Sequence, residues 1–142
     1  MTVQTILVPM FAQVALTFAL LFWMSILLLR AVRTGQVAAQ DVALREPNWP
    51  PRVLQVANAF HNQLELPVLF YTVVLLAFVT QTLDTVLLVL SWMFVLSRFV
   101  HAYIHVTSNR LDRRTAVFTV GAIALLLMWV IVIARFLLQA TY

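Results

Sequence analysis

Cysteine is absent from the 142-residue sequence, and its absence excludes disulfide bonds and thiolate metal sites. Only two glycines occur, Gly35 and Gly121, so we expect the helices to be largely unbroken. Charge is scarce: 10% of residues are charged and 63% are hydrophobic, whereas soluble domains have about 25% and about 45–50%. A soluble fold could not cover this much apolar surface. The sequence therefore predicts an all-α integral membrane protein.

Long apolar runs make up most of the chain. A membrane-spanning helix needs about 20 consecutive, mainly apolar residues. Four stretches qualify, at about 6–29, 53–79, 83–105 and 116–138. We expect one four-helix transmembrane domain covering residues 1–142. Pro67 lies inside the second stretch, where it removes a backbone hydrogen bond, so we expect it to kink that helix.

The arginines flank these spans. All nine basic residues are arginine, and most lie in two connections, 30–52 and 106–115, whereas the short connection at 80–84 has none. The first connection contains Arg30, Arg33, Arg45 and Arg52, opposed by Asp41 and Glu46. The positive-inside rule places both arginine-rich connections in the cytoplasm and both termini across the membrane. Although the isoelectric point is near 10.7, arginines at the ends of apolar spans form no soluble basic face, so we expect no nucleic-acid partner.

Two of the predicted helices carry a polar stripe. At 100° per residue, the second helix places Asn58, Asn62 and Glu65 within about 60° of arc, and His61 widens this to about 100°. On the third helix, Arg98, His101, His105 and Asn109 fall within about 80°. Polar side chains facing lipid are costly, so we expect these stripes to face each other or a neighbouring subunit.

Glu65 and Arg98 are predicted to lie at nearly the same depth. Glu65 follows Arg52 by about 20 Å of helix, and Arg98 precedes Arg110 by about 18 Å, measured from the same membrane face. We therefore predict a buried ion pair between Glu65 and Arg98, within the chain or across a subunit boundary. The stripes together describe a polar pocket that opens to the cytoplasm and ends at this pair.

Three uses of such a pocket are compatible with its residues. It can be a structural hydrogen-bond network that fixes helix packing. It can bind a small anionic ligand, with positive charge from Arg98 and from Arg113 or Arg114. It can hold a metal ion, because His61 with Glu65 and His101 with His105 each have i, i+4 spacing. Since an arginine beside a cation is unfavourable, we expect no metal.

The sequence resembles a known membrane family. The segment Asn62-Gln63-Leu64-Glu65-Leu66-Pro67-Val68-Leu69-Phe70 is similar to the hallmark of the MAPEG superfamily, the membrane-associated proteins in eicosanoid and glutathione metabolism. The spacing of Arg98, His101, His105 and Asn109, followed by Arg113, is similar to the family's third helix and its entry to the fourth. The chain looks closest to a bacterial branch, which implies the bacterial inner membrane with periplasmic termini.

The resemblance implies a left-handed four-helix bundle that forms a homotrimer and binds glutathione between subunits. It implies a glutathione-dependent transferase or peroxidase acting on lipophilic electrophiles. Arg113 and Arg30 are the expected catalytic arginines. The expected ligand-binding residues are Asn58, Asn62, Glu65, Arg98, His101 and His105.

One departure from the family pattern supports a second hypothesis. Glutathione-binding members usually carry an arginine one turn before the asparagine, where this chain has Asn58. An amide does not replace the bidentate contact of an arginine with a carboxylate. The alternative is therefore a non-catalytic membrane protein, either an accessory subunit of a larger membrane complex or a binder of lipid or small anions.

Overall fold

The computed structural model describes residues 3–42 and 48–139, and every regular element in these ranges is helical. In chain order the elements are α1 (Val3–Arg33), η1 (Ala39–Val42), α2 (Pro51–His61), η2 (Asn62–Leu64), α3 (Leu66–Val79), α4 (Thr85–Val106) and α5 (Leu111–Gln139). Four spans are long and apolar enough to cross a membrane, with α2 to α3 counting as one. The predicted four-helix membrane fold is thus confirmed. Arg45 and Glu46 of the first connection lie outside the described residues.

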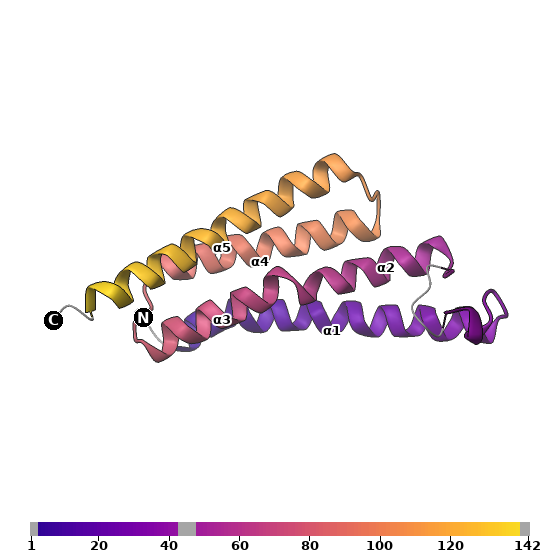
Figure 1. The fold of residues 1–142 in the computed structure, drawn as a ribbon, viewed down its shortest axis with the longest axis horizontal. Helices are drawn as coiled ribbons and strands as arrows, with labels where there is room; N and C mark the ends of the chain where they lie inside the picture. The colour runs from indigo at the N-terminus through magenta and orange to yellow at the C-terminus, as the bar shows by residue number, and fades with distance from the viewer. Residues whose placement is uncertain (1–2, 43–47, 140–142) are drawn as a thin grey trace.

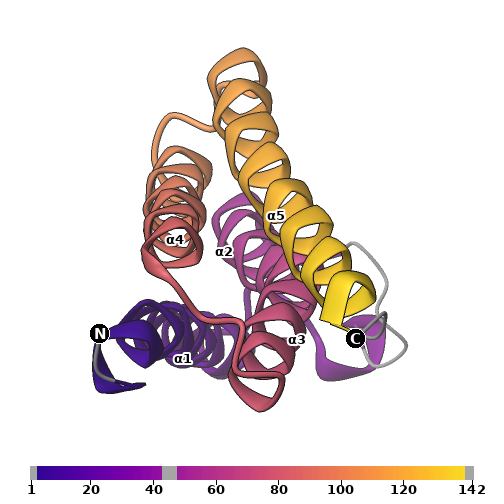
Figure 2. The same ribbon diagram turned by 90° about the vertical axis from the view of Figure 1, so that its left-hand side faces the viewer.

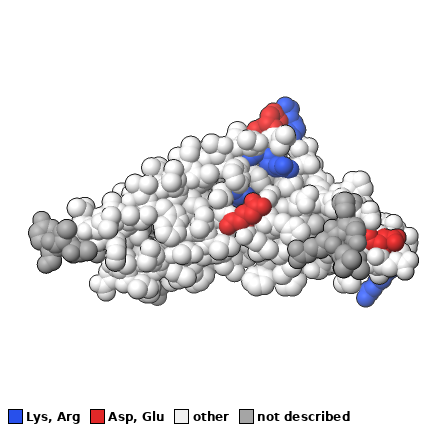
Figure 3. All heavy atoms as spheres, viewed as in Figure 1, with Lys and Arg blue, Asp and Glu red and all other residues white. Residues whose placement is uncertain are grey.

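The helices lie lengthwise beside one another (Figure 1). Both termini are at one end of the bundle, and the α1–α2 and α4–α5 connections are at the other, which we call the loop end. On the face drawn in Figure 3, the charged side chains lie at the loop end or toward the middle of the molecule. The two arginine-rich connections therefore share one end, as the charge pattern requires.

Local sequence sets where the helices begin and end. α1 ends at Arg33, and two residues later Gly35 turns the chain away with a φ of +70°, the left-handed conformation that glycine adopts without strain. α4 begins after Asp84, whose side chain accepts a hydrogen bond of 2.9 Å from the backbone N–H of Leu87. α5 begins at Leu111, earlier than the expected 116, because the polar residues after Arg110 form its first turn rather than a loop.

The main core lies between α3, α4 and α5. Phe70 and Phe94 are fully buried there and stack with ring centroids 4.6 Å apart. Gly121 allows α5 to approach α4 closely, because a Cβ at this position would lie 2.3 Å from Ser97 Oγ. Small residues at such contacts are typical of membrane helix pairs. The two helices are therefore held together along this half of the bundle.

The loop-end half of the bundle is more open. α5 packs along α4 and against α3, whereas its packing against α2 is slight. Viewed from the end of the bundle, α5 runs obliquely across the other helices (Figure 2). The side of α2 that faces α5 is therefore left uncovered near the loop end.

An ion pair fixes the opposite end. Arg135 Nη2 donates a hydrogen bond of 2.6 Å to Asp84 Oδ2, and Arg135 Nη1 donates one of 2.7 Å to the carbonyl of Thr82. No local sequence pattern predicts this contact, because Arg135 lies within an apolar run. The hydrogen bond from Arg135 holds the pKa of the Asp84 carboxyl below its usual value. The end of α5 is thereby tied to the α3–α4 connection.

We predict that Asp84→Asn lowers the melting temperature in detergent at neutral pH and that this difference shrinks in acid. A carboxyl whose folded pKa is depressed stabilises the fold above its unfolded pKa of about 3.9, and this contribution is lost as pH falls through the folded pKa. Asparagine still caps a helix, so the variant isolates the charge. An equal difference at pH 7 and pH 3 would contradict the assignment.

Candidate functional site

The second span breaks in the middle. After α2, one 3₁₀ turn leads to Glu65, whose φ of −98° and ψ of −105° are not helical, and α3 then begins. Pro67 has no N–H to donate to an earlier carbonyl, and it restricts the residue before it, so a regular helix cannot pass through. The predicted kink at Pro67 is confirmed, and it takes the form of a break at residues 62–65.

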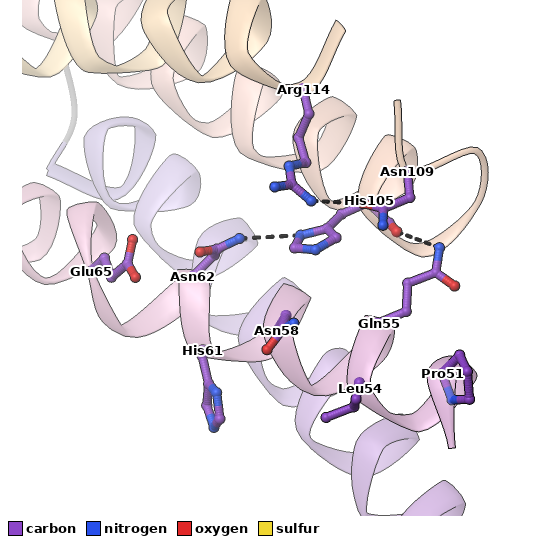
Figure 4. A pocket seen from close by; sticks show the side chains of 10 residues that line it. All are labelled: Pro51, Leu54, Gln55, Asn58, His61, Asn62, Glu65, His105, Asn109 and Arg114. Carbon is purple, nitrogen blue, oxygen red and sulfur yellow. Dashed lines mark hydrogen bonds between the residues drawn. The ribbon is translucent and has the colours of Figure 1, made fainter. Parts of the chain in front are cut away.

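A polar pocket of about 640 Å³ lies beside this break (Figure 4). Its walls come from α2, η2, the end of α4 and the start of α5. The lining residues are Pro51, Leu54, Gln55, Asn58, His61, Asn62, Glu65, His105, Asn109 and Arg114. Binding sites for small molecules commonly have volumes of about 300–1,000 Å³. The polar stripe of the second span therefore lines a space large enough for a ligand.

Hydrogen bonds hold the walls of this pocket together. Asn62 Nδ2 lies 3.2 Å from His105 Nδ1, which joins η2 to α4. Gln55 Nε2 donates to the backbone carbonyl of His105 at 2.7 Å, and Arg114 Nη1 donates to Asn109 Oδ1 at 2.6 Å. These contacts are drawn in Figure 4. Their effect is to fix several donors and one guanidinium around a common space.

A second, smaller cavity of about 210 Å³ adjoins the pocket. Asn62 and Arg114 line both spaces, and His101, Thr115 and Phe118 complete the smaller one. Among the described residues, Arg114 is the basic residue that lines both cavities. The two spaces therefore share its guanidinium.

Arg98 is buried behind the smaller cavity. Its side chain has no exposed surface, its Nη2 lies 3.1 Å from His101 Nδ1, and its Cζ lies 5.4 Å from the ring centroid of Phe118. Its Nε has no hydrogen-bond partner among the described residues. A buried guanidinium with an unmet donor is costly unless a further partner is supplied.

The predicted ion pair of Glu65 with Arg98 is not formed within one chain. The two ion pairs in the described part of the chain are those of Arg110 with Asp112 and Arg135 with Asp84. Glu65 is exposed at the helix break, although its charge acts on Arg98 through space. The break turns the glutamate outward instead of holding it on a straight helical stripe. Pairing across a subunit boundary stays a prediction.

The structure brings together some of the predicted site residues and not others. Asn58, Asn62, Glu65 and His105 line the pocket, and His101 lines the adjoining cavity. The two predicted catalytic arginines, Arg30 and Arg113, are exposed and line neither space. Arg114, the residue after Arg113, lines both spaces instead. Within residues 3–42 and 48–139, no group of three His, Asp or Glu side chains is close enough to hold a metal ion.

Two polar residues of the pocket, Gln55 and Asn109, were given no ligand role from the sequence. Gln55 lies one turn before Asn58 on the same face of α2, so the helical period would have identified it. Asn109 continues the stripe of α4 but belongs to the α4–α5 connection, where its φ of +48° directs the chain toward α5. That left-handed backbone is a conformation that asparagine tolerates better than most residues.

The sequence model of the MAPEG family matches residues 7–134. The chain belongs to the MAPEG family. The matched residues reach into all four spans and include those that line both cavities. The match confirms the resemblance based on the motif at residues 62–70. Members of this family are membrane proteins with glutathione-related transferase and peroxidase roles. No curated protein and no solved structure matches the chain.

We predict that Glu65→Gln lowers the melting temperature of the purified protein by removing the one carboxylate near Arg98 in the described chain. Within one chain Glu65 is exposed and forms no ion pair with Arg98, so the variant tests pairing across a subunit boundary, where removing one partner of a buried charge would destabilise the assembly. Asp112→Asn is the matched control, because Asp112 is an exposed carboxylate whose ion pair with Arg110 is worth little. If Glu65→Gln and Asp112→Asn leave stability and assembly equally unchanged, Glu65 does not compensate Arg98.

Proposed function

We propose that this MAPEG protein binds glutathione in the polar pocket and directs its thiol at lipophilic electrophiles or lipid hydroperoxides. Family membership supports the use of glutathione at the level of the family. The observation that carries the proposal for this chain is Arg114, which lines both adjoining cavities. A tripeptide lying in the larger space can therefore extend its central thiol side chain toward the smaller one while staying close to one cation.

The electrostatics of the pocket suit an anionic thiol. A thiolate is favoured by a nearby positive charge, which lowers the pKa of the thiol, and the thiolate is the nucleophile. In this proposal Arg114 stabilises the thiolate, and Asn58 and Asn62 bind peptide groups of glutathione by hydrogen bonds. His101 and His105 lie beside the same spaces and are candidates for general base. In the transferase reaction the thiolate sulfur bonds the electrophilic atom, and the leaving group departs.

Assembly as a homotrimer is part of this proposal. The pocket is open where α5 separates from α2, and a polar space facing lipid is costly. A neighbouring subunit covering that side removes the cost and encloses the ligand. Such a neighbour can also bring its Arg30 to the pocket, since Arg30 is exposed at the loop end of α1. The two arginine-rich connections then lie in the cytoplasm, and the protein resides in a bacterial inner membrane.

A non-catalytic role is the second candidate, and the hydrogen bonds within the pocket favour it. Asn62 bonds His105, and Arg114 bonds Asn109. A network that satisfies its own polar groups can serve helix packing alone. The amide of Asn58, in place of the usual family arginine, also weakens recognition of a carboxylate. In this case the chain is an accessory subunit of a larger membrane complex or binds lipid or small anions.

Titration of the purified protein with glutathione tests the proposal. Binding is measured by the fluorescence of the four tryptophans or by the melting temperature in detergent. We expect saturation at millimolar glutathione. Arg114→Gln should weaken binding at least about tenfold, because a hydrogen bond to a charged group is lost. Arg113→Gln is the matched control: it removes the same charge one residue away, outside the pocket, and should change little.

The outcomes separate the two candidates. Absence of any saturable change at millimolar glutathione contradicts glutathione binding and favours the non-catalytic role. Equal weakening by Arg113→Gln and Arg114→Gln shows that surface charge, not the pocket, attracts the ligand. If glutathione binds but its thiol shows no increase in thiolate absorbance at neutral pH, the chain binds without activating the thiol, and the transferase step is excluded.

A further inference from the structure

A second groove, unlike the first, is apolar and lies between α1 and α4. Its volume is about 230 Å³, and no polar side chain other than Trp23 and Tyr103 lines it. The lining residues are Leu16, Ala19, Leu20, Trp23, Phe99, Ala102, Tyr103 and Val106. The nearly buried Leu20 and Ala102 form its floor, while the partly exposed Trp23, Phe99 and Tyr103 form its rim. The small side chains of Ala19 and Ala102 make this surface concave.

The groove is separate from the glutathione pocket proposed above. It lies on the side of α4 that faces α1, whereas the polar pocket lies on the side that faces α5. Figure 2 shows α1 and α4 adjacent to each other, with α5 running obliquely beside α4 on a different side. His105 and Val106 are consecutive on α4, yet each lines a different space. A ligand in the groove would therefore not compete directly for the polar pocket.

A cation lies at the loop-end mouth of the groove. The guanidinium of Arg52 is 5.1 Å from the ring centroid of Trp23, and its Nη1 donates to the backbone carbonyl of Val106. Its other recorded hydrogen bond, of 3.2 Å, goes to the neutral side chain of Gln55. In residues 3–42 and 48–139, Arg52 forms no ion pair. No carboxylate in the described residues therefore pairs with this charge, which lies beside two groove residues.

We propose that this groove binds an anionic phospholipid, with one acyl chain along the floor and the phosphate on Arg52. The groove offers an acyl chain an apolar channel in a helical span, and the mouth offers a phosphate a guanidinium, which is the group best suited to it. Aromatic side chains such as Trp23 and Tyr103 typically lie at the level of lipid headgroups. The cation of Arg52 therefore lies beside the apolar groove in the same way that the phosphate of a phospholipid lies beside its acyl chains.

Native mass spectrometry of the delipidated full-length protein tests this proposal with two lipids of identical acyl chains, phosphatidylglycerol and phosphatidylcholine. We expect about fivefold tighter retention of phosphatidylglycerol, the effect of one arginine on an anionic lipid. Arg52→Gln should abolish this preference. Arg33→Gln removes an exposed charge at the same end but away from the groove, so it should preserve the preference.

A second variant tests the groove itself. Ala19→Phe fills the channel from its exposed side and should weaken retention of both lipids, even if Arg52→Gln fails to fold. Equal retention of the two lipids by the wild type, or equal effects of Arg33→Gln and Arg52→Gln, overturns the proposal. So does competition by sn-glycerol 3-phosphate, which would identify a site for a free phosphate. If Ala19→Phe changes the oligomeric mass and not lipid retention, the groove is a subunit contact. Ala19 lies outside the polar pocket, so Ala19→Phe of unchanged oligomeric mass should titrate with glutathione like the wild type, and the two proposals fail separately.

Discussion

A helix that breaks inside a membrane must find partners for its polar groups within the protein, because lipid offers none. The second span of this chain breaks at residues 62–65 under the influence of Pro67. Gln63, buried at the break, donates to the carbonyl of Ala59 at 2.9 Å and accepts from Gln13 of α1 at 2.9 Å. This amide contact attaches α1 to the break. On the other side of the break, Asn62 contacts His105 of α4. The positions of three helices thus depend on the hydrogen bonds that satisfy the polar groups of one interrupted helix.

The break also explains why the two halves of the bundle differ. Beyond it, α3 packs with α4 and α5 around Phe70 and Phe94, and the contact of Arg135 with Asp84 secures that end. Before it, one face of α2 packs Val56 and Ala59 into an apolar cluster with α1 and α4, while the face toward α5 carries amide and imidazole groups, and α5 separates from it. The polar pocket lies in this second half.

The sequence predicted the spans, the kink and much of the pocket because hydropathy and helical period act locally. Asn58, Asn62 and His105 came together as a 100° periodicity implies. The pairing of Glu65 with Arg98 assumed an unbroken helix, and the turn before Pro67 leaves Glu65 exposed.

Other contacts could not be predicted, because they depend on how distant segments meet. The choice of Arg114 over Arg113 follows from where α5 begins, which a polar run at the membrane surface does not specify. The contacts of Gln13 with Gln63 and of Arg135 with Asp84 join residues about fifty positions apart, and no local pattern links them. The groove between α1 and α4 likewise combines side chains that look like ordinary lipid-facing residues in the sequence.

The central claim is that the space beside the helix break is a ligand site and not only a packing network. The most direct test is an electron cryomicroscopy structure of the purified protein in lipid nanodiscs with millimolar glutathione. The account predicts density for the tripeptide between α2 and α5, in contact with Asn62 and Arg114, with its sulfur near the cavity lined by His101 and Phe118. Glutathione density outside this pocket, or a pocket closed by its own side chains at saturating glutathione, would contradict it.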